Sequence, residues 1–296
     1  MDYKALDLVS DRNNLRKLLR WATRAMDKAF RIDVELVGTK TIVFSRCEEK
    51  TSETIPPGQF RGFGHTFEHA VTRVDHQYAT GHHRIITYVG QRLLSRAQTK
   101  FNFLQNLAGL KVLLRFEVDA CLPSVSDLAD ALSGASLSST ASASKTSQLT
   151  TAPSSSSATT NPVSVQLTGT PLVAQDSLVE LKTMSQNKNV IWNEVYPQLH
   201  LSGTPHLYVA KHFKGSFTTL QRHDLHSSTL RPYAKVVEQE LGKLVKLLGE
   251  LSTYLQEAGP GIGFSLIGGV GGDLKLYRRK KGTGRGLTKD IVARFT

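Results

Sequence analysis

Cysteine is almost absent from this sequence of 296 residues, which contains only Cys47 and Cys121. Neither belongs to a Cys-x-x-Cys pair, so the sequence predicts no disulfide framework and no zinc finger, and it favours a reducing compartment. Long apolar runs are absent as well, because none approaches the ~20 residues that a membrane-spanning helix needs. The N-terminal residues Met1–Lys4 lack the apolar core of a signal peptide. We therefore expect a cytosolic or nuclear protein with no membrane partner.

Several catalytic signatures are also missing. The histidines show no zinc-ligand spacing, no Asp-Asp-x-x-Asp motif of prenyl-diphosphate enzymes occurs, and no nucleophile–base arrangement of Cys, Ser and His is evident. Gly282, Gly284 and Gly286 follow a basic run and do not open a strand–turn–helix unit, so they are no dinucleotide fingerprint.

Negative charge is scarce relative to positive charge. The chain has 25 Asp and Glu against 37 Lys and Arg, which gives a formal net charge of +12. Such an excess suits a polyanionic partner, of which nucleic acid is the commonest. Hydrophobic residues make up 40% of the chain, which is enough for a substantial core in one large domain or two small ones.

The composition changes abruptly at residues 133–170, where Ser, Thr and Ala dominate. Such a segment cannot bury enough apolar surface to offset its ordering entropy. We interpret it as a disordered insertion within a single domain, whose two parts are residues 1–132 and 171–281. Residues 282–296 form a basic tail. The preceding run Arg278–Lys281 suits RNA phosphates or nuclear import, although a solvated tail is the plainer interpretation.

Apolar periodicity predicts helices interleaved with strands, hence an α/β (α+β) fold with a central mixed β-sheet flanked by helices. Helices are expected at 11–30 with Asp11 as N-cap, at 64–78 with Phe67, Ala70, Val71 and Val74 inward, at 190–200 with a kink at Pro197, and at 233–258. Strands are expected at 32–37, 41–46, 84–89, 110–120, 178–183, 206–212, 216–221, 263–267 and 273–277.

Two of these strands carry acidic residues at alternating positions. Glu117 and Asp119 should share one face of the first strand, and Glu180 and Lys182 one face of the second. Carboxylates gathered in this way are costly unless something compensates their charge. A pair of divalent metal ions would do so, and metals held by oxygen ligands activate water to attack phosphate esters. A metal-dependent phosphodiester hydrolase is therefore the first hypothesis, and two solvated strand faces with a surface ion pair explain the two motifs equally well.

Further motifs follow one another along the chain. They are Asp7–Leu15 with Arg12, Gly64-His65-Thr66-Phe67-Glu68, Glu117-Val118-Asp119, Val179-Glu180-Leu181-Lys182-Thr183, and Gln198 followed by Gly203-Thr204-Pro205. The Glu-x-Asp and Glu-x-Lys strands resemble the PD-(D/E)xK nuclease pattern. The whole succession resembles the DXO family of decapping exoribonucleases, which includes the nuclear partner of the yeast 5′-to-3′ exoribonuclease. The resemblance runs from residue 7 to about residue 281.

Carried over position by position, the resemblance implies a role for each motif. Mg²⁺ or Mn²⁺, as one or two ions, would be bound by Glu68, Glu117, Asp119, Glu180 and the Leu181 carbonyl. Glu180, Lys182 and Gln198 would be catalytic, with Lys182 and Gln198 positioning the attacking water and the scissile phosphate. Arg12 would contact a phosphate of the RNA 5′ end. On sequence alone, Arg12 and Gln198 are more simply explained as surface residues, and Glu68 equally well as an exposed carboxylate.

The resemblance implies a hydrolase of RNA 5′ ends. It would remove incomplete or non-standard caps, or pyrophosphate from 5′-triphosphate RNA, and could degrade RNA from the 5′ end. A 5′-to-3′ exoribonuclease is the implied protein partner and the nucleus the favoured location. Family members have a longer segment before the arginine motif, so we expect part of the usual sheet or RNA channel to be missing. The alternatives are a non-catalytic RNA-binding or exonuclease-partner protein on the same fold, and a DNA nuclease of the same metal chemistry.

Overall fold

The structure is a computed structural model of the chain. It describes residues 2–25, 28–49, 56, 62–72, 109–123, 173–280, 283 and 287–296, and the backbone of 83–89. The predicted insertion at 133–170 lies outside the described residues, so its interpretation as a disordered segment and the domain limits drawn from it stay predictions.

The larger of two sheets is built around a short parallel strand. Its order is β11-β10-β2-β3-β1-β5-β4, and β1 runs parallel to both β3 and β5 while the other neighbours are antiparallel. The strands are β1 (Leu8–Asp11), β2 (Phe30–Val37), β3 (Thr41–Cys47), β4 (His83–Val89), β5 (Val112–Val118), β10 (Gly263–Gly268) and β11 (Leu274–Arg278).

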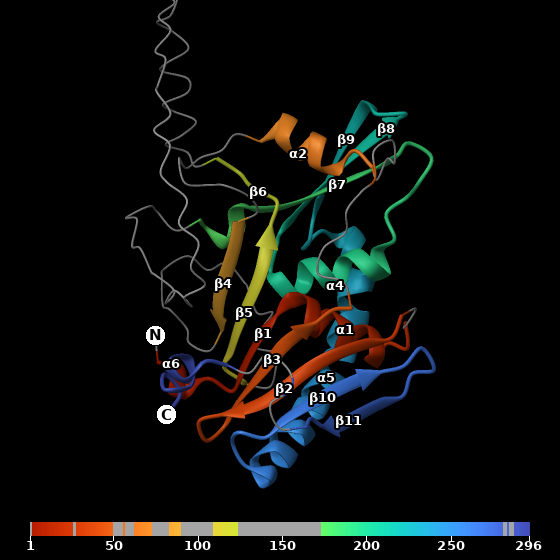
Figure 1. Cartoon of the computed structure of the whole chain (residues 1–296). Helices are drawn as coiled ribbons and strands as arrows, with labels where there is room; N and C mark the ends of the chain where they lie inside the picture. Colours follow the sequence, from red (N-terminus) through yellow and green to blue (C-terminus); the bar gives the residue numbers. More distant parts are fainter. Residues whose placement is uncertain are drawn as a thin grey trace, which may run out of the picture.

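The smaller sheet follows directly from the larger one. The chain leaves β5 at Val118 and, after Asp119, enters the second sheet, whose order is β6-β7-β8-β9. Its strands are β6 (Ala120–Cys121), β7 (Leu178–Ser185), β8 (His206–Phe213) and β9 (Ser216–Asp224), and β7 and β8 are parallel. Figure 1 shows this sheet at one end of the molecule and the larger sheet at the other.

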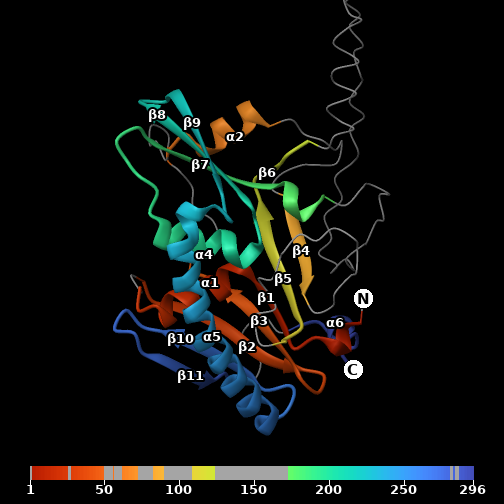
Figure 2. The same ribbon diagram turned by 180° about the vertical axis from the view of Figure 1, so that it is seen from behind.

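Three helices pack on one another and on the sheets to form the main core. They are α1 (Arg12–Ala22), α4 (Trp192–Ser202) and α5 (Arg231–Ala258). Both views in Figures 1 and 2 show them grouped beside the larger sheet, with α4 towards the smaller sheet. The apolar stripe of α5 lies in this core, as its spacing predicts, with Val237, Leu241, Leu244, Leu248, Leu251 and Leu255 buried. Among the described residues, no helix has both the length and the apolar character needed to cross a bilayer.

A second, smaller core covers the opposite face of the larger sheet. It contains Leu6, Val37, Val43 and Phe295, with Val9 and Leu113 packed against it. Val9 and Leu113 alternate with Leu8 and Val112 of the main core, as strand geometry requires. The C-terminal helix α6 (Lys289–Val292) closes this side. Gly38 has a φ of +62°, and a Cβ there would lie 2.3 Å from the Phe295 carbonyl oxygen, so this turn needs glycine.

The expected mixed α/β class is confirmed, but the strands divide between two sheets. Strand 110–120 was expected to be continuous, and it instead ends at Val118 because the chain changes sheets there. Neither β1 nor α6 was predicted, because each has only four residues and is too short to show a periodicity.

Two predicted helices are shorter than expected. The helix expected at 11–30 ends at Ala22, because Arg24 adopts the left-handed conformation with a φ of +57°. The helix expected at 64–78 is α2 (Gly64–Val71), which ends where Thr72 becomes extended and its hydroxyl donates to the Glu68 carbonyl oxygen. Of its predicted inward residues, Phe67 is buried, Ala70 and Val71 are exposed, and Val74 lies outside the described residues.

The start of α1 depends on Asp11, as the sequence predicts. Its side chain accepts a hydrogen bond of 2.9 Å from the backbone N–H of Asn14. Replacing Asp11 by alanine should lower the free energy of unfolding by about 1 kcal/mol, because this N–H loses its cap. Urea unfolding followed by circular dichroism measures the change. Asp2→Ala removes a cap from a three-residue 3₁₀ helix and is the control, with a loss near zero. Equal losses in the two variants would contradict the assignment.

Candidate active site

The candidate site lies at the edge of β7 nearest to β6. β7 pairs with β8 along its whole length, but with β6 only through Leu178 and Val179. From Glu180 onward, the described residues supply no strand on that edge. Asp119 fills the next position, where its carboxylate accepts a hydrogen bond of 2.8 Å from the Leu181 N–H. The structure thus brings the two acidic strands together.

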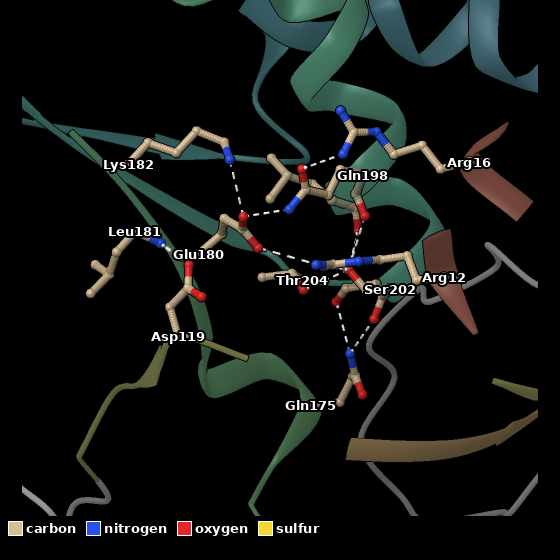
Figure 3. A network of polar contacts seen from close by, with 12 residues as sticks. Arg12, Arg16, Asp119, Gln175, Glu180, Leu181, Lys182, Gln198, Ser202 and Thr204 are labelled. Atoms are coloured by element: carbon tan, nitrogen blue, oxygen red, sulfur yellow. Dashed lines mark hydrogen bonds and ion pairs between the residues drawn. The ribbon is translucent and has the colours of Figure 1, made fainter. Parts of the chain in front are cut away.

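Glu180 is the centre of a polar network, as Figure 3 shows. Only 7% of its side chain is exposed. Lys182 Nζ donates to one carboxylate oxygen at 3.1 Å, and the Gln198 side-chain amide donates to the same oxygen. Arg12 Nη1 lies 3.5 Å from the other oxygen. Three predicted residues, Arg12 of α1, Lys182 of β7 and Gln198 of α4, therefore converge on the carboxylate of a fourth, Glu180.

Other residues, for which the sequence suggested no role, hold this network in place. The Ser202 hydroxyl accepts from Arg12 Nη1 at 3.2 Å and lies 2.8 Å from the Thr204 hydroxyl. The Gln175 side-chain amide donates to the carbonyl oxygens of Ser202 and Gly203 at 2.8 and 3.0 Å. The only available signal was that Ser202 and Thr204 flank the Gly203 that ends α4, which has a φ of +60°.

Arg16 is the other functional candidate that sequence reasoning missed. Its Nη1 donates to the side-chain oxygen of Gln198 at 3.3 Å, and this contact directs the amide nitrogen of Gln198 towards Glu180. Burial, together with the nearby positive charges of Arg20 and Arg12, lowers the pKa of the Arg16 guanidinium. The position of Arg16 one helical turn after Arg12 was the signal that could have revealed it.

Two carboxylates, those of Glu180 and Glu68, lie within electrostatic reach of Asp119. Burial first, then repulsion from Glu180 and Glu68, raises the pKa of Asp119 to about 6, against the opposing effects of the Leu181 N–H and Lys182. Glu68 is positioned by α2, where His65 Nδ1 lies 3.7 Å from its carboxylate. A carboxylate whose proton affinity is raised by its neighbours is a common feature of functional sites.

Glu117 is placed differently from the other predicted ligands. It is exposed near the end of β5, opposite Arg84 of β4, whereas Asp119 has already left the strand. Glu117 and Asp119 thus lie on either side of the point where β5 ends, and the expectation that their side chains share a face stays a prediction.

Oxygen donors are suitable ligands for Mg²⁺ or Mn²⁺, and a bound cation would relieve the repulsion that adds to the effect of burial on the pKa of Asp119. In the described part of the chain, however, no three His, Cys, Asp or Glu side chains are arranged to hold one ion. The donor chemistry of Asp119, Glu180 and Glu68 thus fits a divalent cation, while the full ligand set with Glu117 and the Leu181 carbonyl stays a prediction.

An aromatic cluster anchors α2 to the β8–β9 hairpin. The ring centroids of Phe63 and His212 lie 4.7 Å apart, and those of Phe67 and Phe217 lie 4.6 Å apart. Phe63 packs directly over Gly215, where a Cβ would lie 2.4 Å from the ring. Because Glu68 projects from α2, these contacts help to determine where its carboxylate lies.

The arrangement of the two sheets and the helices is similar to that of several solved structures. The structure is similar to S. pombe Rai1 in complex with 3′-FADP, with a TM-score of 0.56 at 13% identity over 93% of this chain and 72% of that one. It is also similar to K. lactis Dxo1 in complex with manganese, with a TM-score of 0.54 at 10% identity over 96% of this chain and 68% of that one. For Candida albicans Rai1 in complex with pU5 and Mn²⁺, the TM-score is 0.54 at 11% identity over 98% of this chain and 75% of that one. The fold is that of the Rai1 and Dxo1 decapping nucleases, which confirms the resemblance at the level of the fold.

The family itself is identified by sequence. Residues 1–266 match the family described as a domain of unknown function, DUF8563, and the chain belongs to that family. No curated protein matches the sequence. At 10–13% identity, the similarity to Rai1 and Dxo1 shows a shared fold, and the reaction must be argued from the site.

The raised pKa of Asp119 makes stability depend on pH. Its folded value of about 6 lies above the unfolded value of 3.8, so its contribution is most favourable below pH 3.8 and is lost as the pH rises through 6. Asp119→Asn should therefore raise the free energy of unfolding at pH 7 by about 1–2 kcal/mol in chelator, after discounting for partial exposure. Urea unfolding between pH 3.5 and 8 measures this, with exposed Asp176→Asn as control. A variant no more stable than the wild type at pH 7 would refute the electrostatic conflict.

Gly215 is predicted to be essential for the position of α2. With a φ of +93° and Phe63 over its Cα, Gly215→Ala should lower the free energy of unfolding by about 1–3 kcal/mol and speed hydrogen exchange in α2. Gly249→Ala is the matched control, because it lies exposed on α5 with no heavy atom within 4 Å of the new Cβ. The control should be neutral or stabilising, by up to about 1 kcal/mol. Unchanged exchange in α2 of Gly215→Ala would rule out the anchoring role.

Proposed function

We propose that this chain is a divalent-cation-dependent hydrolase of RNA 5′ ends, which removes incomplete or non-standard caps or pyrophosphate from 5′-triphosphate RNA. The observation that carries the proposal is the convergence of Arg12, Lys182 and Gln198 on Glu180, beside Asp119. The net charge of +12 suits RNA. The solved relatives bound to manganese, and to pU5 with Mn²⁺, support the choice of metal and substrate.

The carboxylates of Asp119, Glu180, Glu68 and Glu117 and the Leu181 carbonyl would hold the cation. A divalent cation bound there would lower the pKa of a water molecule and stabilise charge on the phosphate. Side chains of the protein would position the phosphate and the attacking water. Lys182 places an ammonium group beside Glu180, where it donates to a non-bridging phosphate oxygen and offsets charge as the bond to water forms. Gln198, fixed by Arg16, orients the attacking water.

Arg12 is suited to bind the 5′ phosphate. Its guanidinium is largely buried between Glu180 and the Ser202 hydroxyl, and a planar guanidinium offers paired donors to phosphate oxygens. In this arrangement, phosphate and Glu180 compete for Arg12. Stepwise 5′-to-3′ degradation, a partner exoribonuclease and a nuclear location belong to the proposal as further expectations.

One observation favours the alternative of a non-catalytic RNA-binding protein. Both oxygens of Glu180 are engaged by donors of the chain itself, and no three-ligand group is assembled among the described residues. A protein that used these residues only to stabilise its fold would show the same network. The hydrolase needs a metal ion to cleave RNA, whereas the binding protein does not cleave RNA with or without metal. A cleavage assay with and without metal therefore separates the two hypotheses.

The decisive experiment is a cleavage panel. The full chain is incubated, with Mn²⁺, with Mg²⁺ or in chelator, with 5′-triphosphate RNA, NAD-capped RNA, 5′-monophosphate RNA and DNA of one sequence. We expect metal-dependent cleavage of RNA, lowered by about 10²–10³-fold in Glu180→Gln and in Lys182→Met, because each loses a group that stabilises the transition state. Exposed Glu250→Gln on α5 is the control and should retain full activity.

The other outcomes decide between the alternatives. RNA binding without cleavage, and without a rise in melting temperature on adding Mn²⁺, would establish the binding protein. Equal cleavage of DNA and RNA would establish a nuclease that does not recognise the 2′-hydroxyl.

A further inference from the structure

Helix α1 carries a row of arginines, of which the first two, Arg12 and Arg16, contact residues of the candidate site. Arg12, Arg16 and Arg20 are spaced four residues apart, and this spacing places them on one face of the helix. Like charges at this spacing destabilise a helix unless other groups compensate them. Lys17, by contrast, lies off the row and donates to Glu48 at 2.6 Å.

The compensation available to the first two arginines is incomplete. Arg12 shares Glu180 with Lys182, so two cationic groups meet one carboxylate. Arg16 is half-buried, and the hydrogen bond it makes among the described residues is to the neutral amide oxygen of Gln198. Glu180 and Glu194 offset its charge only from a distance, and burial with the neighbouring arginines lowers the pKa of Arg16.

The pairing of these cations points to a particular kind of ligand. Arg12, Arg16 and Lys182 lie around Gln198 and Glu180, as Figure 3 shows, and among the described residues Glu180 is the only carboxylate that forms an ion pair with any of them. An anion that matches them must carry several charges. It must also be extended, because four residues of helix separate the Cα atoms of Arg12 and Arg16 by about 6 Å along the axis.

Linked phosphates meet both requirements. They carry a charge on each unit, and successive phosphates present oxygen pairs that suit the forked donors of two guanidinium groups. A single phosphate would satisfy Arg12 and leave Arg16 on a neutral acceptor. The half-buried position of Arg16 strengthens its attraction to phosphate, because opposite charges attract more strongly where less water surrounds them.

We propose that Arg16, together with Arg12, forms a subsite for the linked phosphates of a 5′-triphosphate RNA end. This assignment rests on the proposed function and deepens it, because it makes Arg16 the residue that separates 5′-triphosphate from 5′-monophosphate ends. A phosphate chain that takes over Arg16 also releases the side-chain oxygen of Gln198, and one that takes over Arg12 releases Glu180. Arg16 therefore positions Gln198 in the free site and binds phosphate in the occupied site.

Equilibrium binding in chelator tests the subsite without cleavage. The full chain is titrated with 5′-triphosphate, 5′-monophosphate and 5′-hydroxyl RNA of one sequence, and inorganic tripolyphosphate serves as competitor. The wild type should bind the triphosphate end about 10-fold or more tightly than the monophosphate end, the effect of one or two charged hydrogen bonds. Tripolyphosphate should compete, because the subsite recognises phosphates and not the nucleotide.

Two variants of Arg16 and one control make the test specific. Arg16→Gln should abolish the preference for triphosphate and change 5′-hydroxyl RNA binding by less than about threefold. Arg16→Lys keeps the positive charge but loses the paired donors of the guanidinium group, so it should retain part of the preference for the triphosphate end. Lys17→Gln removes a charge from the neighbouring position and should weaken binding of all three RNAs equally, leaving the preference intact. Unfolding midpoints verify that each variant is folded.

The possible failures are distinguishable. Equal binding of triphosphate and monophosphate ends by the wild type, or equal weakening of all three RNAs in Arg16→Gln, overturns the subsite. If Arg16→Gln is unfolded, an unchanged preference in Arg16→Lys with no competition by tripolyphosphate overturns it. A triphosphate preference lost in Arg16→Gln, in a chain that cleaves nothing with Mn²⁺, supports the subsite and refutes the hydrolase.

Discussion

The burial of one carboxylate is the constraint on which the arrangement of this molecule depends. Glu180 is 5% exposed on a strand whose neighbouring residues are apolar, and an ionised group there is costly unless opposite charges and hydrogen-bond donors surround it. Those donors come from three elements: Arg12 from α1, Lys182 from β7 and Gln198 from α4. The packing of α1 against α4 is therefore fixed by polar groups at one end and by leucines along the rest of the interface.

The two sheets deliver their polar residues at the points where the chain leaves them. Asp11 is the last residue of β1 and also the N-cap of α1, so that the central parallel strand fixes the first turn of the helix and with it Arg12. Asp119 stands between β5 and β6, and it contacts Leu181 because the chain crosses there from one sheet to the other. Both acidic groups are positioned by topology, and neither depends on a long loop.

The parts of the site that sequence predicts are those fixed by local geometry. Glu180 and Lys182 share a strand face because alternation over two residues is strict, and Asp11 caps a helix by a contact three residues away. The position of Glu117 relative to Asp119 stays a prediction, because alternation holds only while a strand continues in one sheet and β5 ends at Val118. Arg16 was missed because its partner Gln198 is 182 positions distant, and no local pattern reports that α1 and α4 pack together. The short strand β1 was missed for a related reason, since its place at the centre of a sheet is set by its neighbours.

The electrostatics of the site explain why acids and cations are assembled there in the same small space. Burial, followed by repulsion from Glu180 and Glu68, raises the pKa of Asp119, while burial and the neighbouring charges of Arg20 and Arg12 lower the pKa of Arg16. In the described conformation each set partly neutralises the other, through the contact between Arg12 and Glu180 and that between Lys182 and Glu180. Donors of the chain therefore occupy both oxygens of Glu180, and no three-ligand group of His, Cys, Asp or Glu is assembled among the described residues. The same two sets would be fully compensated by a cation on the acidic side and linked phosphates on the basic side, which is the combination that a metal-dependent phosphoryl hydrolase must bind.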